Sequence, residues 1–518
     1  MTSLFRFLAL SLGTTLAMEA SAGPAAEQGL FDRVTDRAER LADAPYEAPD
    51  ADLPPALTEL DYDTYRQIRF RPDRALWHDD GLFEVQLFHP GFLYDQPVAL
   101  NLVDQDGEVS PLPFDPSRFR YDGEAAKLAD LDAEALGDLG YAGFRLHYPL
   151  NSGDYRDEFM VFLGASYFRM IGRDQGYGLS SRGLAIDTGA PRGEEFPAFR
   201  EFWLVEPGPE DTHLTVYALL DSPSLSGAYR FEIAPGEPTT VETEARLFAR
   251  EDVAKLGIAP LTSMYLHGGL GNYPADDYRP RVHDSSGLAM QTGDGERIWR
   301  PLSNPETLHL SSLQDTSPQG FGLIQRPRRF DAYLDAEARY ETRPSEWVTP
   351  LGDWGQGRVE LVEIPSDSEA NDNITAYWIP EQPLEAGQSR TFRYRLSTLG
   401  ATPPDQRLAH VLRSRQGWGA TPGQDDPPPA SQRVFIVDFQ GPTLDGLEAD
   451  QPVEPRLSTS SGELIEPRVQ RLPDHTWRVS FRLAPEDGTP ADMRLALTLH
   501  GEPLTETWNY VWYPDERR

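Results

Sequence analysis

The sequence predicts a mainly β protein, with a large N-terminal β-sandwich or supersandwich followed by a smaller C-terminal immunoglobulin-like sandwich. From residue 81 onward, short runs of alternating apolar and polar residues are separated by turn residues, which is typical of strands. These runs do not alternate regularly with helical segments, so a parallel doubly wound sheet is disfavoured. A chain of 518 residues also exceeds one compact core, so two or three domains are expected.

The N-terminus has the parts of a secretory signal peptide. Arg6 precedes an apolar run over residues 7–17, and Ala20-Ser21-Ala22 offers small residues for cleavage. The apolar run is too short for a membrane anchor, and no later stretch reaches spanning length. No twin-Arg pair is present. We therefore expect residues 1–22 to be a Sec-type signal peptide and the mature chain to be exported without a membrane span.

Composition excludes several classes of function. The net charge of −36 disfavours binding to nucleic acid or to an anionic lipid surface. There is no cysteine, and the ten histidines include no close pair at metal-ligand spacing, so we expect no metal and no cofactor. The sequence contains no Gly-x-Ser-x-Gly elbow, His-Glu-x-x-His motif, P-loop or Rossmann glycine fingerprint. After these exclusions, the carboxyl groups of Asp and Glu remain as the candidate catalytic groups.

The large domain is expected to span residues 23–398. Leu30, Phe31, Val34, Ala38 and Leu41 recur at helical spacing near its start. Residues 60–77 combine a short helical turn with a strand, and residues 124–139 predict a helix. Runs of strand character follow one another through this domain, at residues 83–89, 98–103, 144–148, 159–163, 214–220 and 390–396.

Residues 399–431 are predicted to be a linker. They include a short helix over residues 406–415 and a segment rich in Pro, Asp and Gly over residues 421–431. Residues 432–518 then contain six or seven short strand-like runs in about 85 residues, which is typical of an immunoglobulin-like sandwich.

An acidic loop lies between two predicted strands at residues 359–364 and 374–378. It contains Asp367, Glu369, Asn371, Asp372 and Asn373. Loops held by a rigid sheet often carry catalytic groups, although a solvated turn is the simpler explanation for this loop alone. Arg, Tyr and Trp are interleaved with Asp and Glu in three further clusters, at residues 166–203, 273–302 and 330–357. Such a surface suits a polysaccharide, as an acid/base glycoside hydrolase or equally as a binding module.

Long motifs in these clusters resemble the periplasmic glucan biosynthesis family of G- and D-type proteins. They include LDYDTYRQIRFRPDRALW, SYFRMIGRDQGYGLSSRGLAIDT, DDYRPRVHDSSGL, ARYETRPSEWVTPLGDWGQGRVELVEIPSDSEANDNITAYW and LTETWNY, and the likeness covers about residues 31–512. The signal peptide without a twin-Arg pair is more similar to the G type. The resemblance implies a periplasmic location, a large β-sandwich catalytic domain joined to an immunoglobulin-like domain, and a role in making osmoregulated glucans with a β-1,2-linked backbone.

The resemblance also implies an activity and its residues. D-type members resemble inverting endo-β-1,2-glucanases, and their motifs place the general acid at Asp372 and the general base at Asp284. Tyr340, Arg343 and Glu369 match positions that line the substrate or relay a proton. G-type members can be weak hydrolases, so low turnover is compatible with this expectation. Where family motifs commonly have Asp or Asn, this chain has Ser286, which keeps a polar group there.

An inverting enzyme needs one protonated carboxyl group and one ionised carboxylate. We expect repulsion from Glu369 to help raise the pKa of Asp372. We expect His283, with Arg279 or Arg281, to favour the ionised form of Asp284. Residues that could contact the sugar are His283 and three tryptophans, each of which could instead pack in a core, namely Trp299, Trp354 and Trp378.

A non-catalytic role is the alternative. The chain could bind emerging β-1,2-glucan and assist an inner-membrane glucan synthase or branching enzymes. A homodimer is a further expectation. The C-terminal domain shows no carboxylate cluster with aromatic company, so we expect it to have a structural or docking role.

Overall fold

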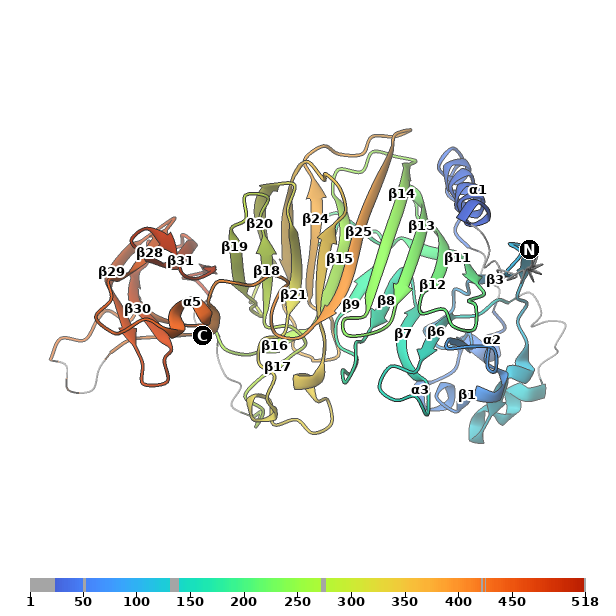
Figure 1. Ribbon diagram of the computed structural model, residues 1–518, viewed down its shortest axis with the longest axis horizontal. Helices are drawn as coiled ribbons and strands as arrows, with labels where there is room; N and C mark the ends of the chain where they lie inside the picture. The colour runs from blue at the N-terminus through green and yellow to red at the C-terminus, as the bar shows by residue number, and fades with distance from the viewer. Residues whose placement is uncertain are drawn as a thin grey trace, which may run out of the picture.

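The computed structural model describes residues 24–49, 53–130, 139–271, 276–420, 423 and 425–516. The predicted signal peptide lies outside this range. The described chain is mainly β, as expected, and Figure 1 shows two large sheets at its centre, the C-terminal strands at one end and α1 and β1 at the other. Among the described residues, no helix has both the length and the apolar character that crossing a membrane requires.

Helices are few and mostly short in the described ranges. The longest, α1, buries Phe31, Val34 and Ala38 against β12 and β13, which confirms the helical spacing seen in the sequence. The α-helices are α1 (Pro24–Ala42), α2 (Pro55–Thr58), α3 (Tyr62–Tyr65) and α5 (Pro442–Asp445), and the 3₁₀ turns are η1 (Pro72–Arg74), η2 (Pro116–Arg118), η3 (Gly123–Asp130), η4 (Phe330–Ala332) and η5 (Tyr340–Thr342).

One large sheet has ten strands, with neighbours in the order β2-β6-β7-β8-β9-β15-β24-β23-β20 and with β10 paired to β15. Its strands are β2 (Glu84–Phe88), β6 (Gly143–Tyr148), β7 (Asp157–Leu163), β8 (Tyr167–Met170), β9 (Ser180–Arg182), β10 (Leu184–Ile186), β15 (Leu256–Ser263), β20 (His309–Thr316), β23 (Gln356–Glu363) and β24 (Ile374–Pro380).

The other large sheet has fifteen strands, in the order β28-β31-β33-β19-β18-β21-β22-β25-β14-β13-β12-β11-β3-β4, with β32 paired to β31. Its strands are β3 (Ala99–Val103), β4 (Val109–Pro111), β11 (Ala198–Val205), β12 (Leu214–Asp221), β13 (Leu225–Ala234), β14 (Thr240–Ala249), β18 (Gly287–Gln291), β19 (Arg297–Pro301), β21 (Gly320–Ile324), β22 (Ser345–Pro350), β25 (Ser389–Leu399), β28 (Val453–Thr459), β31 (Ala491–Leu499), β32 (Glu502–Pro503) and β33 (Thr507–Trp512).

The two large sheets pack face to face. Phe162 and Phe168 of the ten-stranded sheet contact Phe199 and Phe231 of the fifteen-stranded sheet, with ring centroids 5.5–6.4 Å apart. Aromatic rings at these separations pack edge to face, which adds to the burial of their apolar area. This shared core makes the large domain a β-sandwich, as predicted.

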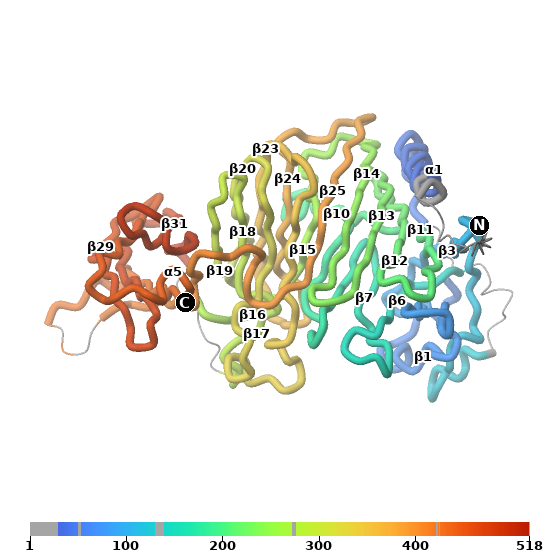
Figure 2. Tube along the Cα trace, viewed as in Figure 1, coloured from blue at the N-terminus to red at the C-terminus, as the bar shows by residue number. Residues whose placement is uncertain are grey.

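Three smaller sheets complete the described part of the structure. β1 (Ile68–Phe70) pairs with β5 (Phe119–Tyr121), and β16 (Tyr265–His267) pairs with β17 (Val282–His283). β16 and β17 lie beyond the lower ends of the long strands of the large sheets (Figure 1, Figure 2). The four-stranded sheet has the order β26-β27-β30-β29, with β26 (His410–Gly417), β27 (Arg433–Gln440), β29 (Glu463–Arg471) and β30 (Trp477–Ala484).

The C-terminal sandwich shares a sheet with the large domain. Phe435 and Phe481 of the four-stranded sheet pack against Trp508 of β33, with ring centroids 6.2 Å apart. β33 in turn pairs in parallel with β19, which aligns Trp508 with Trp299. The two parts of the chain are therefore joined by a strand pairing as well as by residues 400–409.

Two predicted helices differ from the structure. The helix expected over residues 406–415 is wrong, because β26 occupies most of that segment and pairs with β27. Val411 and Ser414 are buried while Leu412, Arg413 and Arg415 are exposed, because the pairing with β27 shifts by one residue between Val411 and Arg413. The helix expected over residues 124–139 is a 3₁₀ helix, η3, as far as Asp130, and residues 131–138 lie outside the described range. The limits of the domains themselves stay a prediction.

A buried ion pair joins the two parts of the chain. Arg326, next to β21, donates two hydrogen bonds to Glu506, next to β33, over 2.6 and 2.9 Å. The guanidinium group also donates to the carbonyl of Val411 and stacks on Trp299, 3.5 Å from its ring centroid. Removing one partner of such a pair leaves an uncompensated buried charge.

Glu506→Ala is therefore expected to lower the free energy of unfolding by about 3–5 kcal/mol. Urea unfolding followed by tryptophan fluorescence measures this loss. Asp331→Ala is the matched control, because it removes the partner of the exposed Arg329 and should cost much less. Equal losses in the two variants would show that the Arg326–Glu506 pair contributes no more to the free energy of unfolding than an exposed ion pair.

Candidate active site

A buried asparagine fixes the base of the acidic loop. β23 and β24 pair as far as Glu363 and Ile374, and the loop connects them. Asn373 donates to the carbonyls of Ile364 and Tyr265 over 2.9 and 3.0 Å, and its carbonyl accepts from the Tyr265 amide over 2.8 Å. The side chain thus replaces a strand partner where the ladder stops, and it ties the loop to β16.

Asp284 directly follows β17, which pairs with β16. Its backbone amide donates to the carbonyl of Met264 over 2.9 Å, and its side chain is only 5% exposed. Arg343 Nη1 donates to Asp284 Oδ1 over 2.5 Å. The structure therefore brings Asp284 and Arg343 together, 59 positions apart in the sequence.

The pKa of Asp284 is raised to about 6. Burial is the main cause, and the charge of Asp372 raises it further, while Arg343 and then Arg169 act in the opposite direction. A carboxyl group with this pKa is mostly ionised at pH 7. The influence of Asp372 on this pKa also shows that the acidic loop lies near Asp284.

Asp372 lies in the acidic loop with 31% of its side chain exposed. Its pKa is raised, chiefly by burial, while Arg169, Arg343 and Arg182 lower it. Arg169 Nη2 is 3.8 Å from Asp372 Oδ2. The pKa is thus shifted in the expected direction, but the cause is loss of water rather than repulsion from Glu369.

Glu369 is held by a different set of contacts. Its Oε2 accepts from the Tyr340 hydroxyl over 2.8 Å and from Arg279 Nη1 over 2.7 Å. Arg279 also bonds to Asp277 and Asp335, so it does not serve Asp284 as the sequence suggested. Tyr340 and Arg343 lie together, with the guanidinium group 4.3 Å from the ring centroid.

His283 lies behind the site. It is buried, stacks on Tyr265 with centroids 5.1 Å apart, and its carbonyl accepts from Gln325 Nε2. Burial lowers the pKa of His283 to about 3, so the imidazole is neutral near pH 7. The expectation that its charge favours ionised Asp284 is therefore wrong, and its burial leaves no surface for a sugar.

The three tryptophans are core residues. Trp299, Trp354 and Trp378 are 4%, 8% and 0% exposed. Trp354 packs against Trp378 and Phe392, and Trp299 lies under Arg326. Their expected role as sugar platforms is wrong for this structure, because a stacking platform needs an exposed ring face.

The sequence did not single out three residues near Asp372. Arg169 and Tyr167 lie on β8, and Arg182 lies on the neighbouring β9 with its guanidinium group 4.9 Å from the Tyr167 ring. Arg182 and Arg169 lower the pKa of Asp372, and the charge of Asp372 is one cause of the raised pKa of Tyr167. The Arg- and Tyr-rich composition of residues 166–203 was the available signal. It indicated this segment, but it could not show which arginine or tyrosine lies near Asp372.

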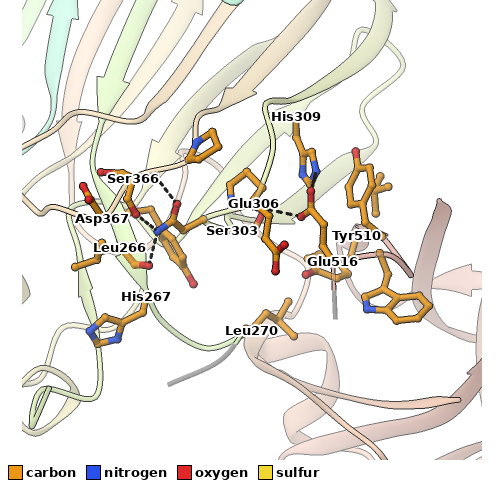
Figure 3. A pocket seen from close by; sticks show the side chains of 18 of the residues that line it. Leu266, His267, Leu270, Ser303, Glu306, His309, Ser366, Asp367, Tyr510 and Glu516 are labelled. Atoms are coloured by element: carbon orange, nitrogen blue, oxygen red, sulfur yellow. Dashed lines mark hydrogen bonds and ion pairs between the residues drawn. The ribbon is translucent and has the colours of Figure 1, made fainter. Parts of the chain in front are cut away.

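A cavity of about 920 Å³ opens beside the acidic loop (Figure 3). Its lining includes Asp367 and Asn371 of the loop but neither Asp284 nor Asp372. No group of three or more His, Cys, Asp or Glu within the described ranges is arranged to hold a metal ion. The chemistry available at Asp284 and Asp372 is that of two carboxyl groups among arginines.

Comparison with known proteins gives one consistent match. The family described as "Periplasmic glucan biosynthesis protein, MdoG" matches residues 30–512. A Ralstonia nicotianae protein named "Glucans biosynthesis protein G" is 48% identical over 513 residues, which cover 98% of this chain and 100% of that protein. A protein of the same name from Vibrio cholerae serotype O1 is 46% identical over 491 residues, covering 94% of this chain and 88% of the relative. This chain therefore belongs to the periplasmic glucan biosynthesis protein MdoG family.

Proposed function

We propose that this protein is an inverting endo-β-1,2-glucanase that cleaves the backbone of periplasmic glucans. The observation that carries the proposal is that two carboxyl groups from separate loops, Asp284 and Asp372, both have raised pKa values and share the influence of the same arginines, Arg343 and Arg169. Arginines flank each of them, at 2.5 Å from Asp284 and 3.8 Å from Asp372. Two carboxyl groups with raised pKa values in one site suit glycoside hydrolysis.

In this mechanism Asp372 is the general acid and Asp284 the general base. Asp372 donates its proton to the glycosidic oxygen as the bond from that oxygen to the anomeric carbon breaks. Asp284 accepts a proton from the water that attacks the anomeric carbon from the opposite face, so the configuration is inverted. The products are two shorter glucans, and the proton taken up by Asp284 returns through solvent to Asp372.

The surroundings of each carboxyl group support these roles. Arg343 opposes the effect of burial on Asp284, which keeps that carboxylate mostly ionised at neutral pH. Asp372 is partly exposed, so a bound sugar would remove more of its water and raise its pKa further. The acid thus gains its proton when substrate covers it.

Glu369 and Tyr340 supply a polar path beside the pair. The Tyr340 hydroxyl donates to Glu369, and Arg279 holds the same carboxylate oxygen from another side. We assign Tyr340, Glu369 and Arg343 to substrate positioning and to proton transfer through hydroxyl groups or water.

The family is one of periplasmic proteins, and the signal peptide expected over residues 1–22 supports that location for this chain. The contact with an inner-membrane glucan synthase and the homodimer stay predictions.

Asp372→Asn is expected to lower kcat on linear β-1,2-glucan by about 10²–10⁴-fold, because an amide cannot donate the proton. Product lengths are followed by chromatography, and NMR of the newly formed reducing end should show the α-anomer first. Asp294→Asn, in an exposed turn between β18 and β19, is the matched control and should keep full activity. Glucan that binds but stays intact with the unmodified protein would favour the assembly role instead.

The pH dependence offers a second test. Asp284 must be ionised to act as base, so kcat/KM should fall as the pH drops below about 6. Arg343→Gln removes a cation that lowers this pKa, so the acidic limb should move to higher pH. Arg339→Gln, which removes an exposed guanidinium group paired with Glu341, is the control and should leave the limb in place. An acidic limb that does not move in Arg343→Gln would contradict the assignment of Asp284.

A further inference from the structure

The cavity beside the acidic loop has walls from both parts of the chain. In Figure 3, Leu266, His267, Ser366 and Asp367 lie on one side and Tyr510 and Glu516 on the other. The first group belongs to the large domain and the second to β33 and the segment after it. Gln416 of β26 adds a further contribution from the C-terminal sandwich.

The lining has the chemistry that a neutral carbohydrate needs. Asp367 and Asn371 offer oxygen acceptors, and the half-buried Tyr513 offers a ring edge and a hydroxyl group. The carboxylates in the walls disfavour an anionic ligand. A volume of about 920 Å³ lies near the upper end of the ~300–1,000 Å³ range usual for ligand sites, which is enough for several sugar units.

Two polar groups of the lining are unused. Within the described residues, no hydrogen bond or ion pair engages the exposed side chain of Asp367. Gln416 also lines the cavity, and its Oε1 atom is buried and has no hydrogen-bond partner in the described part of the chain. The exposed carboxylate of Asp367 is therefore the group of this pair that is open to a hydrogen bond from a ligand hydroxyl group.

The cavity also adjoins the carboxylate pair through the chain itself. Asn371 lines the cavity and the next residue, Asp372, belongs to the pair, so their Cα atoms are about 3.8 Å apart. Pro365, Ser366 and Asp367 line the cavity as well, while Glu369 faces Tyr340 and Arg279. The acidic loop thus contributes residues both to the cavity and to the carboxylate pair.

The two walls are fixed relative to each other. Glu516 accepts from His309 Nε2 over 2.9 Å, from the Thr307 hydroxyl over 2.7 Å and from the backbone amides of Glu306 and Thr307 over 3.2 Å. Tyr513 stacks on His309 with centroids 3.7 Å apart. The cavity is therefore held open before any ligand arrives, which lowers the entropy cost of binding.

We propose that this cavity binds a neutral stretch of the same β-1,2-glucan chain whose cleavage site lies at Asp284 and Asp372. The proposal rests on the proposed function for the identity of the glucan. It makes the C-terminal sandwich part of the carbohydrate-binding surface, beyond the structural or docking role that the sequence predicted.

The test measures binding without turnover. Linear β-1,2-gluco-oligosaccharides of increasing length are titrated calorimetrically into the Asp284→Asn variant, alone and combined with Tyr513→Phe or Asp367→Ala, each of which removes one polar group of the lining. We expect each cavity substitution to weaken binding of the longer oligosaccharides by about five-fold, as for loss of one hydrogen bond. Gln470→Ala, on the exposed face of β29, is the control and should not change the affinity.

The outcomes separate this inference from the proposed hydrolysis. Unchanged affinity at every length in both cavity variants, or no binding of β-1,2-glucan at all, overturns the cavity assignment. Weaker binding in the cavity variants supports it even if the unmodified protein never cleaves glucan. Hydrolysis by the unmodified protein together with unaffected cavity variants leaves the proposed function and removes the inference. Crystals of Asp284→Asn soaked with the longest oligosaccharide should show sugar density between Asp367 and Tyr513.

Discussion

The arrangement of the site depends on the three hydrogen bonds of Asn373. They satisfy backbone groups of Ile364 and Tyr265 at the point where the pairing of β23 and β24 ends. Because β16 pairs with β17, the same contacts set the position of Asp284 relative to the acidic loop. Without this side chain, buried backbone groups would lack hydrogen-bond partners. The positions of Asp284 and Asp372 relative to each other would then no longer be fixed by these contacts. Precise placement of this kind is what acid/base chemistry requires.

Exclusion of water then sets the pKa values of the two carboxyl groups within that arrangement. Burial raises the pKa of both Asp284 and Asp372, and arginines limit the rise. The difference in exposure, 5% against 31%, leaves Asp284 governed by fixed protein groups and Asp372 open to the substrate. A bound sugar can therefore change the acid more than the base. That asymmetry is a physical reason to assign proton donation to the more exposed carboxyl group.

The sequence predicted the β-sandwich well because alternation is a local property. It failed at β26, where Leu408, Ala409, Val411 and Leu412 mimic helical spacing and only the partner strand β27 shows the true conformation. The candidate carboxylates came from a resemblance, whereas Arg169 and Arg182 depend on strand pairing that no local pattern encodes. Trp378 was ambiguous for a different reason. A tryptophan packed in a core and a tryptophan on an exposed sugar platform are the same letter in the sequence.

The site also differs from the rest of the molecule in charge. The chain carries a net charge of −36, yet the two carboxyl groups are flanked by Arg169, Arg182 and Arg343. Bulk charge acts through screened, high-dielectric water, while these guanidinium groups act at short range in a partly dry environment. Local arginines therefore outweigh the distant acidic surface in setting the pKa values. A neutral glucan neither gains nor loses from the bulk charge, so the protein can be strongly acidic outside without disturbing the chemistry inside.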